Sequence, residues 1–438
     1  MPADVITLAR VLNPISDTRC DCFADGALAW NRPTPERPSH ILAVGSAADV
    51  QKAHASAATQ IQDHRAQLLL PGLFDTHFHW VQDHVRDAPK TSLLEWLDTY
   101  TFPQEARFAD TDYARAEAEV FWKRILAVGT IGGCCYSSVH AEAAAIALEH
   151  ARGHFRIGNA LMSMHCPDSL RQDPDALLQG VHRLQERFGT RYIVSPRFAP
   201  TTHPELMREA AALAQANQGW IQTHMDETPQ EIAWVLGIYQ QMPGFEDVGT
   251  YAEIYERCGL LGPRTLMGHC IHLEDSEWAL LRATDTAITH CPTSNAPIDQ
   301  RGLGSGLFDF RRADAENIRW ALASDIGGGP YLSMFDVMRS FVSQNRDAGR
   351  TEATWTRALY RATQAGAELA GFGAQAGNLE PGKEASFILI PDKTPKTEIV
   401  DVESILQELV TFSEDTRNTL DSIIDQTVYN GEPLFCSA

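Results

Sequence analysis

The sequence has little positive charge. Its 438 residues include 36 Lys and Arg against 57 Asp and Glu, which gives a formal net charge of −21 at pH 7. A chain of this charge repels phosphate backbones and anionic lipid headgroups. We therefore expect neither nucleic acid nor a membrane surface as a partner, whereas small neutral substrates remain compatible with the composition.

The sequence also lacks long apolar runs and regularly spaced cysteine pairs. No window approaches the roughly 18 apolar residues of a membrane span, and the start, MPADVITLARVLNP, lacks the basic residues and long apolar core of a secretory signal. The nine cysteines are scattered, and no pair has zinc-finger spacing. This usage is typical of a reducing compartment, so we expect a cytoplasmic protein.

Eight apolar segments alternate with helical patterns through the middle of the chain. Helical periodicity is clear in TDYARAEAEVFWKRILAV and HPELMREAAALAQANQ, and strand–helix alternation predicts a parallel sheet. The expected strands are residues 68–79, 128–136, 155–162, 191–198, 219–226, 264–270, 286–291 and 318–325. An open doubly wound sheet would give the same alternation, but no glycine-rich nucleotide loop follows an early strand. The pattern therefore predicts an α/β fold with a (β/α)8 TIM-like barrel over residues 70–375, whose active site lies at the C-terminal strand ends.

The two ends of the chain carry short strand patterns separated by turn-rich segments. The strand candidates are residues 5–12, 27–30, 41–45, 386–390 and 427–435. Neither end can bury much apolar surface alone. We therefore expect residues 1–69 and 376–438 to form one small β-sandwich domain together.

Titratable side chains stand at the ends of five of the expected barrel strands. They are His77 and His79 on the first strand, His224 on the fifth, His269 on the sixth, His290 on the seventh and Asp325 on the eighth. His77 and His79 share one face, because successive side chains of a strand alternate. Strand ends converge at the mouth of a barrel, so three histidines and an aspartate can meet there. Each alone is an ordinary polar residue at a strand end, whereas chance explains the set poorly.

Three neutral imidazoles and one carboxylate suit zinc, or a similar ion such as iron, with one coordination position left for water. Such an ion lowers the pKa of its bound water towards about 7, so the expected chemistry is hydrolytic attack by metal-bound hydroxide. No lysine occurs between Lys123 and Lys383. This absence excludes two metals bridged by a modified lysine, and the sequence predicts a single metal ion.

Four further residues each allow two interpretations. Glu227, three residues after His224, would move protons beside the metal, as deamination requires, or would only be a first-turn glutamate of a helix. Arg197 and Phe198 would hold a carbonyl oxygen and stack on a planar substrate, or Arg197 would form a structural ion pair. Gln82 would hydrogen-bond an amide-like edge, or would be an ordinary loop residue.

The motifs PGLFDTHFH, THMDE, GHC, THCPTSN and SDIGGG, in this order, resemble the metal-dependent amidohydrolase superfamily. More narrowly, residues 92–108 (SLLEWLDTYTFPQEARF), 194–198 (VSPRF) and 324–339 (SDIGGGPYLSMFDVMR) resemble the guanine deaminase family. The resemblance covers residues 68–390 and is weakest before residue 60. It implies a homodimeric hydrolase that acts on a cyclic amidine.

The resemblance also implies a role for each candidate residue. His77, His79, His224 and Asp325 would bind one zinc ion per subunit, with Fe²⁺ as an alternative. The implied catalytic residues are Glu227, His269 and Asp325, with His269 orienting the hydroxide that attacks C2 of guanine. Glu227 would protonate N3 and then assist the release of ammonia, which leaves xanthine. Gln82, Arg197 and Phe198 would hold the base.

One loop departs from the family pattern. Residues 296–304, APIDQRGLG, are a few residues more than this loop usually has, and they follow the seventh strand at the rim. A related reaction is therefore a second hypothesis: deamination of another purine, a pterin or cytosine, or dehalogenation of a triazine. A non-catalytic scaffold is a third, although every candidate ligand is present. His290 and Asn295 adjoin this loop, and we expect them to shape the site rather than bind metal.

Overall fold

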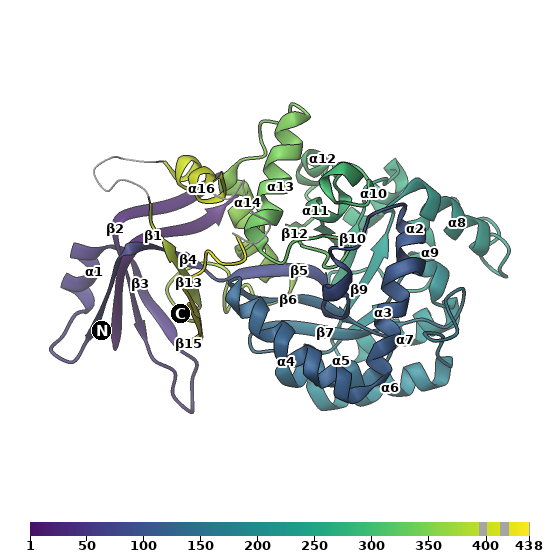
Figure 1. Ribbon diagram of the computed structural model, residues 1–438, viewed down its shortest axis with the longest axis horizontal. Coiled ribbons are helices and arrows are strands. Elements are labelled where there is room, and N and C mark those ends of the chain that lie inside the picture. The colour runs from purple at the N-terminus through teal and green to yellow at the C-terminus, as the bar shows by residue number, and fades with distance from the viewer. Residues whose placement is uncertain (394–400, 412–419, 438) are drawn as a thin grey trace. The chain divides into compact units, whose positions relative to one another are not determined.

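The computed structural model describes residues 1–393, 401–411 and 420–437 and contains two separate sheets (Figure 1). By the density of its internal contacts the chain separates into two compact units. One comprises residues 1–75, 123–133 and 332–438, and the other comprises residues 76–122 and 134–331. Among the described residues, no helix combines the length and the apolar character needed to cross a bilayer.

Eight strands form a sheet in strict sequence order, from β5 to β12. They are β5 (Leu73–His79), β6 (Thr130–Ser137), β7 (His154–Leu161), β8 (Ile193–Pro196), β9 (Trp220–Met225), β10 (Thr265–His269), β11 (Ala287–His290) and β12 (Trp320–Leu322). Neighbours from β7 to β12 pair in parallel, with Gly268 of β10 opposite His224 of β9. Nearly every strand residue is buried, as expected where helices cover a parallel sheet.

The first and last strands of this sheet are joined by hydrogen bonds, so the sheet closes on itself. The amide of Asp325 donates to the carbonyl of His77 at 2.9 Å, and the amide of His79 donates to the carbonyl of Ile326 at 2.7 Å. The Thr76 hydroxyl donates to the carbonyl of Leu322 at 3.1 Å. The predicted (β/α)8 barrel is confirmed.

Helices follow the strands and lie outside the sheet, as α5, α6, α7 and α9 do in Figure 1. The main ones are α4 (Thr111–Ala127), α5 (Ala141–His150), α6 (Pro174–Phe188), α7 (Pro204–Ala216), α8 (Pro229–Tyr239), α9 (Tyr251–Arg257), α10 (Asp275–Thr284), α12 (Phe310–Ala315), α13 (Met334–Asp347), α14 (Trp355–Arg361), α15 (Gln364–Leu369) and α16 (Val402–Thr411). Their starts follow local rules: in α6 the Asp173 side chain accepts from the Ala176 amide, Pro174 is the first helical residue and Gly189 ends the helix at φ 56°.

The two chain ends form one continuous seven-stranded sheet, in the order β15-β14-β13-β4-β1-β2-β3. Its strands are β1 (Val5–Ser16), β2 (Arg19–Asn31), β3 (His40–Ser46), β4 (Gln60–Pro71), β13 (Phe387–Pro391), β14 (Gln426–Tyr429) and β15 (Glu432–Cys436). Its core joins residues from both ends, for example Trp30 against Phe387. The expected union of the chain ends is therefore confirmed. The boundaries 1–69, 70–375 and 376–438 stay a prediction, and residues 394–400, 412–419 and 438 of the last segment lie outside the described residues.

Residues 68–79 do not form the single strand that we expected. The chain breaks at Gly72: β4 ends at Pro71 in the sheet of the chain ends, and β5 begins at Leu73 in the barrel. A Cβ at position 72 would lie 2.4 Å from the Ile131 side chain, so this corner requires glycine. The apolar run looked continuous because both halves are buried.

The close packing of β7 on β8 yields a stability prediction. A Cβ at Gly158 would lie 1.9 Å from the carbonyl oxygen of Ile193. Gly158→Ala should therefore lower the free energy of unfolding by about 1–3 kcal/mol, because the strands must separate to admit the methyl group. The matched control is Gly237→Ala in α8, where nothing lies within 4 Å of the new Cβ and stability should be unchanged or slightly higher. Equal denaturation midpoints for the two variants would contradict this packing.

Candidate active site

Four histidines and one aspartate meet at the C-terminal ends of the barrel strands. The Oδ1 atom of Asp325 lies 3.4 Å from Nε2 of His77 and 3.3 Å from Nε2 of His79, and the Nε2 atoms of His79 and His224 are 3.2 Å apart. Two ligand atoms held tetrahedrally at about 2.0–2.1 Å from one ion would lie roughly 3.3–3.4 Å apart. These separations therefore fit a single metal ion.

His269 stands slightly apart from this group. Its Nε2 lies 3.4 Å from Oε2 of Glu227 and 4.0 Å from Oδ2 of Asp325. Ligand atoms of His77, His224, His269 and Asp325 all lie within 4.8 Å of one another, so His269 also belongs to a possible metal cluster. Nε2 of His269 is buried and has no hydrogen-bond partner among the described residues. A buried nitrogen left in this state is suited to a metal or to a metal-bound molecule.

The imidazoles of the cluster favour the neutral form that binds metals. Burial lowers the pKa of His77, His79, His224 and His269, to about 4 for His79 and well below its ordinary value for His224. Burial alone would raise the pKa of Asp325, but hydrogen bonds from His77 and His79 outweigh it and hold that pKa well below its usual range. Neutral imidazoles around an ionised carboxylate are the donor set that zinc accepts.

Backbone contacts orient these ligands. Nδ1 of His224 donates to the carbonyl oxygen of Arg197 at 2.6 Å, which leaves Nε2 as the free acceptor of the ring. The ring of Tyr136, from β6, stacks on His79 with centroids 4.6 Å apart and an interplanar angle of 15°. His269 and Asp325 have φ of 70° and 50°. The left-handed region costs non-glycine residues energy, and its use at two strand ends is typical of a functional site.

Glu227 lies beside the cluster in a buried position. It follows β9 and precedes α8, and its own amide donates to Oε2 of Glu231 at 2.9 Å within the capping box of that helix. The hydroxyl of Ser305 donates to Oε1 of Glu227 at 3.0 Å. Burial, together with the charge of Asp325 and against the hydrogen bond from Ser305, raises the pKa of Glu227 to about 8. The side chain is therefore a solvent-shielded acid and not the solvated first-turn glutamate of the alternative interpretation.

Gln82, Arg197 and Phe198 line the same cavity as the cluster, and a buried carboxylate connects the first two. Nη1 of Arg197 donates to both oxygens of Glu105, at 2.8 and 2.6 Å, and Nε2 of Gln82 donates to Oε1 at 2.7 Å. Arg197 forms the ion pair of the second interpretation and also lines the cavity, and its role in holding a carbonyl oxygen stays a prediction. Gln82 is 2 % exposed and belongs to this network, so the interpretation as an ordinary loop residue is not supported.

The cavity has a volume of about 410 Å³, including its open mouth. Its polar side comes from His79, His224, His269 and Asp325 of the cluster with Glu227, Gln82 and Arg197, and its apolar side comes from Leu93, Trp96, Leu97, Phe198 and Leu303. Leu93 and Trp96 belong to α2 (Leu93–Trp96), and Leu97 begins the short π-helix η2 (Leu97–Thr101). A flat ring with hydrogen-bonding groups on its edges fits this combination of walls.

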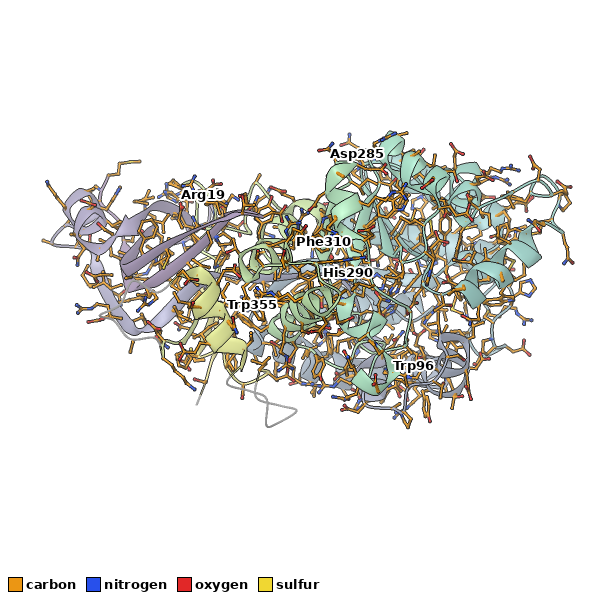
Figure 2. All side chains as sticks on the ribbon, turned by 90° about the horizontal axis from the view of Figure 1, so that it is seen from above. Arg19, Trp96, Asp285, His290, Phe310 and Trp355 are labelled. Atoms are coloured by element: carbon orange, nitrogen blue, oxygen red, sulfur yellow. The ribbon has the colours of Figure 1, made fainter. Side chains whose placement is uncertain are left out.

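We expected both Asn295 and His290 to shape the site. The structure gives the two residues different surroundings. Nδ2 of Asn295 lies 3.1 Å from Nδ1 of His269, so Asn295 orients a member of the cluster. His290 packs into an aromatic layer, with its ring 4.9 Å from Phe308 and 6.4 Å from Trp320. Phe310 lies 6.0 Å from the same tryptophan ring, and Figure 2 labels both His290 and Phe310. His290 is not among the residues that line the cavity.

The longer loop at residues 296–304 is closed at its base. The amide of Leu303 donates to the carbonyl of Ser294 at 2.7 Å, and the amide of Gly306 donates to the carbonyl of Asn295 at 3.2 Å. Only Leu303 from this loop lines the cavity. Leu303 therefore contributes to the apolar wall, while Asn295 and Ser305 on either side of the loop contact His269 and Glu227.

Sequence reasoning missed Glu105, Tyr136, Ser305 and every residue of the apolar wall except Phe198. Glu105, Trp96 and Leu97 lie in residues 92–108, the stretch with the strongest family resemblance, but no residue there ends a strand. Tyr136 does end an expected strand, yet a tyrosine does not titrate near neutral pH and drew no attention. Ser305 follows the loop that departs from the family, and its contact with Glu227 spans 78 residues of sequence.

Comparison with known proteins places the chain in a family. The model of the amidohydrolase family matches residues 68–431, which is most of the sequence. The chain belongs to the amidohydrolase family. The predicted membership of this metal-dependent group is confirmed.

Several individual relatives carry the name of one enzyme of this family. The chain is 34% identical to guanine deaminase of Escherichia coli (strain K12) over 346 residues, 77% of this chain and 76% of the relative. It is 34% identical to guanine deaminase of Dictyostelium discoideum over 333 residues, 73% of this chain and 72% of the relative. The structure of guanine deaminase from C. acetobutylicum, with guanine bound in its active site, superimposes with a TM-score of 0.85 at 25% identity, over 98% of this chain and 99% of that one.

The contact between Gly268 and His77 yields a prediction about metal binding. A Cβ at Gly268 would lie 2.7 Å from Cε1 of His77, so Gly268→Ala should push this imidazole out of position. Because displaced or unsupported ligands typically cost about 10–100-fold in affinity, the metal Kd should rise by about that factor. Competition with a chromophoric chelator measures the Kd, and circular dichroism checks the fold. Unchanged affinity in a folded variant would exclude His77 from the ligand set.

Proposed function

We propose that this protein deaminates guanine hydrolytically to xanthine and ammonia with one bound zinc ion. The observation that carries the proposal is the cavity lined by His79, His224, His269 and Asp325 of the cluster, by the buried acid Glu227 and by the pair Gln82 and Arg197. The named relatives act on guanine, and they support the choice of substrate.

We propose His77, His79, His224 and Asp325 as the zinc ligands. Zinc bound there would supply an electrophilic centre and a water of lowered pKa, and Fe²⁺ would serve in the same donor set. His269, held by Asn295, would accept a hydrogen bond from the attacking water and orient it. All catalytic groups needed beside the metal therefore come from this chain.

Glu227 is the proton shuttle of the proposed reaction. In its protonated form it can deliver a proton to N3 of the ring when C2 is attacked, and it can then carry a proton to the departing amine. The hydrogen bond from Ser305 holds Oε1, so Oε2 is the oxygen that faces His269 and the reacting atoms. Burial raises the pKa of this carboxyl group, which favours the protonated form that the first step requires.

Arg197, Gln82 and Phe198 bind the base. Arg197 and Gln82 can donate to the ring carbonyl oxygen, and Gln82 can also pair with the adjoining ring N–H through its amide. Phe198 supports the ring face. This arrangement presents C2 and its amino group to the metal cluster.

A second candidate is the deamination of a related ring. Leu303, from the longer loop, contributes to the wall of the cavity, and a changed wall alters which rings fit. Another purine, a pterin, cytosine or a triazine would use the same cluster. The homodimer implied by the resemblance and the cytoplasmic location expected from the cysteine usage are also part of the proposal, and analytical ultracentrifugation tests the dimer.

Turnover of a substrate panel tests the function directly. Zinc-loaded protein should convert guanine to equal amounts of xanthine and ammonia, and should process 8-oxoguanine, a pterin, cytosine and a chlorotriazine at least about tenfold less efficiently. Failure to process guanine at full metal occupancy would reject the assignment. Protein that neither contains metal nor takes up zinc would favour the scaffold hypothesis.

Glu227→Gln separates proton transfer from metal binding. The amide is similar in shape and can still accept from Ser305, but it cannot carry the proton, so kcat should fall by about 10²–10⁴-fold with metal content unchanged. Glu205→Gln, at an exposed glutamate of α7, is the matched control and should keep wild-type turnover. Activity of Glu227→Gln above a tenth of wild type would remove the proposed shuttle.

A further inference from the structure

Glu105 is the most enclosed carboxylate near the cavity that the proposed reaction does not use. It lies in α3 (Phe102–Ala106), directly after the π-helix η2, and its side chain is fully buried. It is not among the residues that line the cavity. It contacts the ligand-facing residues Gln82 and Arg197 from behind, at 2.6–2.8 Å.

These contacts determine which way the Gln82 amide points. Its Nε2 donates to Glu105, and its Oε1 accepts from the amide of Gly327 at 3.2 Å. The two partners distinguish the nitrogen end from the oxygen end, so the amide cannot flip without losing both bonds. One N–H and one oxygen lone pair remain for a ligand.

Glu105 also cancels the charge of Arg197. The guanidinium cannot lose its proton in a protein, and both oxygens of Glu105 contact the same Nη1 atom. The remaining N–H groups of Arg197 can still donate, but the pair as a whole carries no net charge. Without Glu105, the same guanidinium would be a buried, unpaired cation that attracts anions.

We propose that Glu105 is a positioning residue that makes the cavity select neutral rings with a carbonyl beside a ring N–H, and reject anionic rings of similar shape. The inference rests on the proposed function in one respect, because it takes Gln82 and Arg197 as the residues that hold the ring. It goes beyond that function by assigning the preference for uncharged ligands to the net charge of one buried pair.

This selectivity has a chemical consequence for turnover. Hydrolytic deamination replaces the amino group at C2 by a carbonyl, so the ring N–H of the product lies between two carbonyl groups. Such an imide N–H is more acidic than the N–H of the substrate, and a larger share of the product is anionic near neutral pH. A neutral Glu105–Arg197 pair therefore favours release of the product over its retention.

Binding of two non-reacting purines tests the proposal. Hypoxanthine has the carbonyl and N–H but no amino group to lose, and urate is an anion at neutral pH. Isothermal titration calorimetry with zinc-loaded protein gives the ratio of the two dissociation constants. Glu105→Gln should shift this ratio towards urate by about tenfold or more, because the pair then carries a positive charge.

The double variant Glu105→Gln/Arg197→Gln removes both charges. Its ratio should return to within about threefold of wild type, although both ligands bind more weakly. Glu105→Asp keeps the charge and should keep the ratio. Asp392→Asn is the matched control, because it breaks the buried Arg10–Asp392 pair in the sheet of the chain ends and should lower thermal stability without changing the ratio.

Two results would overturn the proposal and leave a purely structural ion pair. One is an unchanged ratio in Glu105→Gln. The other is a ratio in the double variant that differs from wild type as much as in the single variant. If Glu105→Gln alone does not fold, Arg197→Gln decides: it leaves Glu105 as an unpaired anion, so the ratio should shift away from urate by about tenfold or more, and an unchanged ratio overturns the proposal. Wild-type protein that binds hypoxanthine but leaves guanine intact would instead reject the proposed function.

Discussion

The buried carboxylate of Asp325 is the electrostatic constraint on which the site depends. It is 5 % exposed, and its nearest partners are imidazoles that burial keeps neutral. A lone carboxylate in such surroundings is costly, and a divalent cation satisfies the carboxylate and the imidazole lone pairs together. Asp325 and His77 are also joined through their backbones at the closure of the barrel. The cluster that could bind a metal and the closure of the sheet therefore involve the same residues.

Charge is handled in two different ways on the two sides of the cavity. On one side, Asp325 carries a negative charge among neutral histidines. A cation from outside the chain would balance that charge. On the other side, Glu105 and Arg197 satisfy each other and leave only hydrogen-bond donors and acceptors for a ligand. Glu227 lines the same cavity, and burial raises its pKa. A polar but uncharged ring is the ligand that suits all three.

The barrel and the cluster were accessible from the sequence because both obey local rules. Strand–helix alternation predicted the eight strands, and the placement of His77, His79, His224, His269 and Asp325 at strand ends predicted their convergence. A turn at Pro71-Gly72 is indicated by the dipeptide itself, but the division of its two flanks between two sheets was not predictable, because it depends on pairing with distant strands. Nor was Glu105, because its two partners lie 23 and 92 residues away and no strand end marks it. The role of His290 was obscured for a related reason: it ends a strand as the ligands do, but its ring turns into the aromatic layer.

The loop at residues 296–304 can alter the wall of the cavity without altering the positions of His269 and Glu227. These two kinds of change are usually linked. Because hydrogen bonds close it at its base, residues can be added or removed there without moving Asn295 or Ser305, which hold His269 and Glu227. Only Leu303 reaches the cavity. Changes in this loop, by evolution or by engineering, could therefore alter which rings fit the cavity while the groups that transfer protons keep their positions.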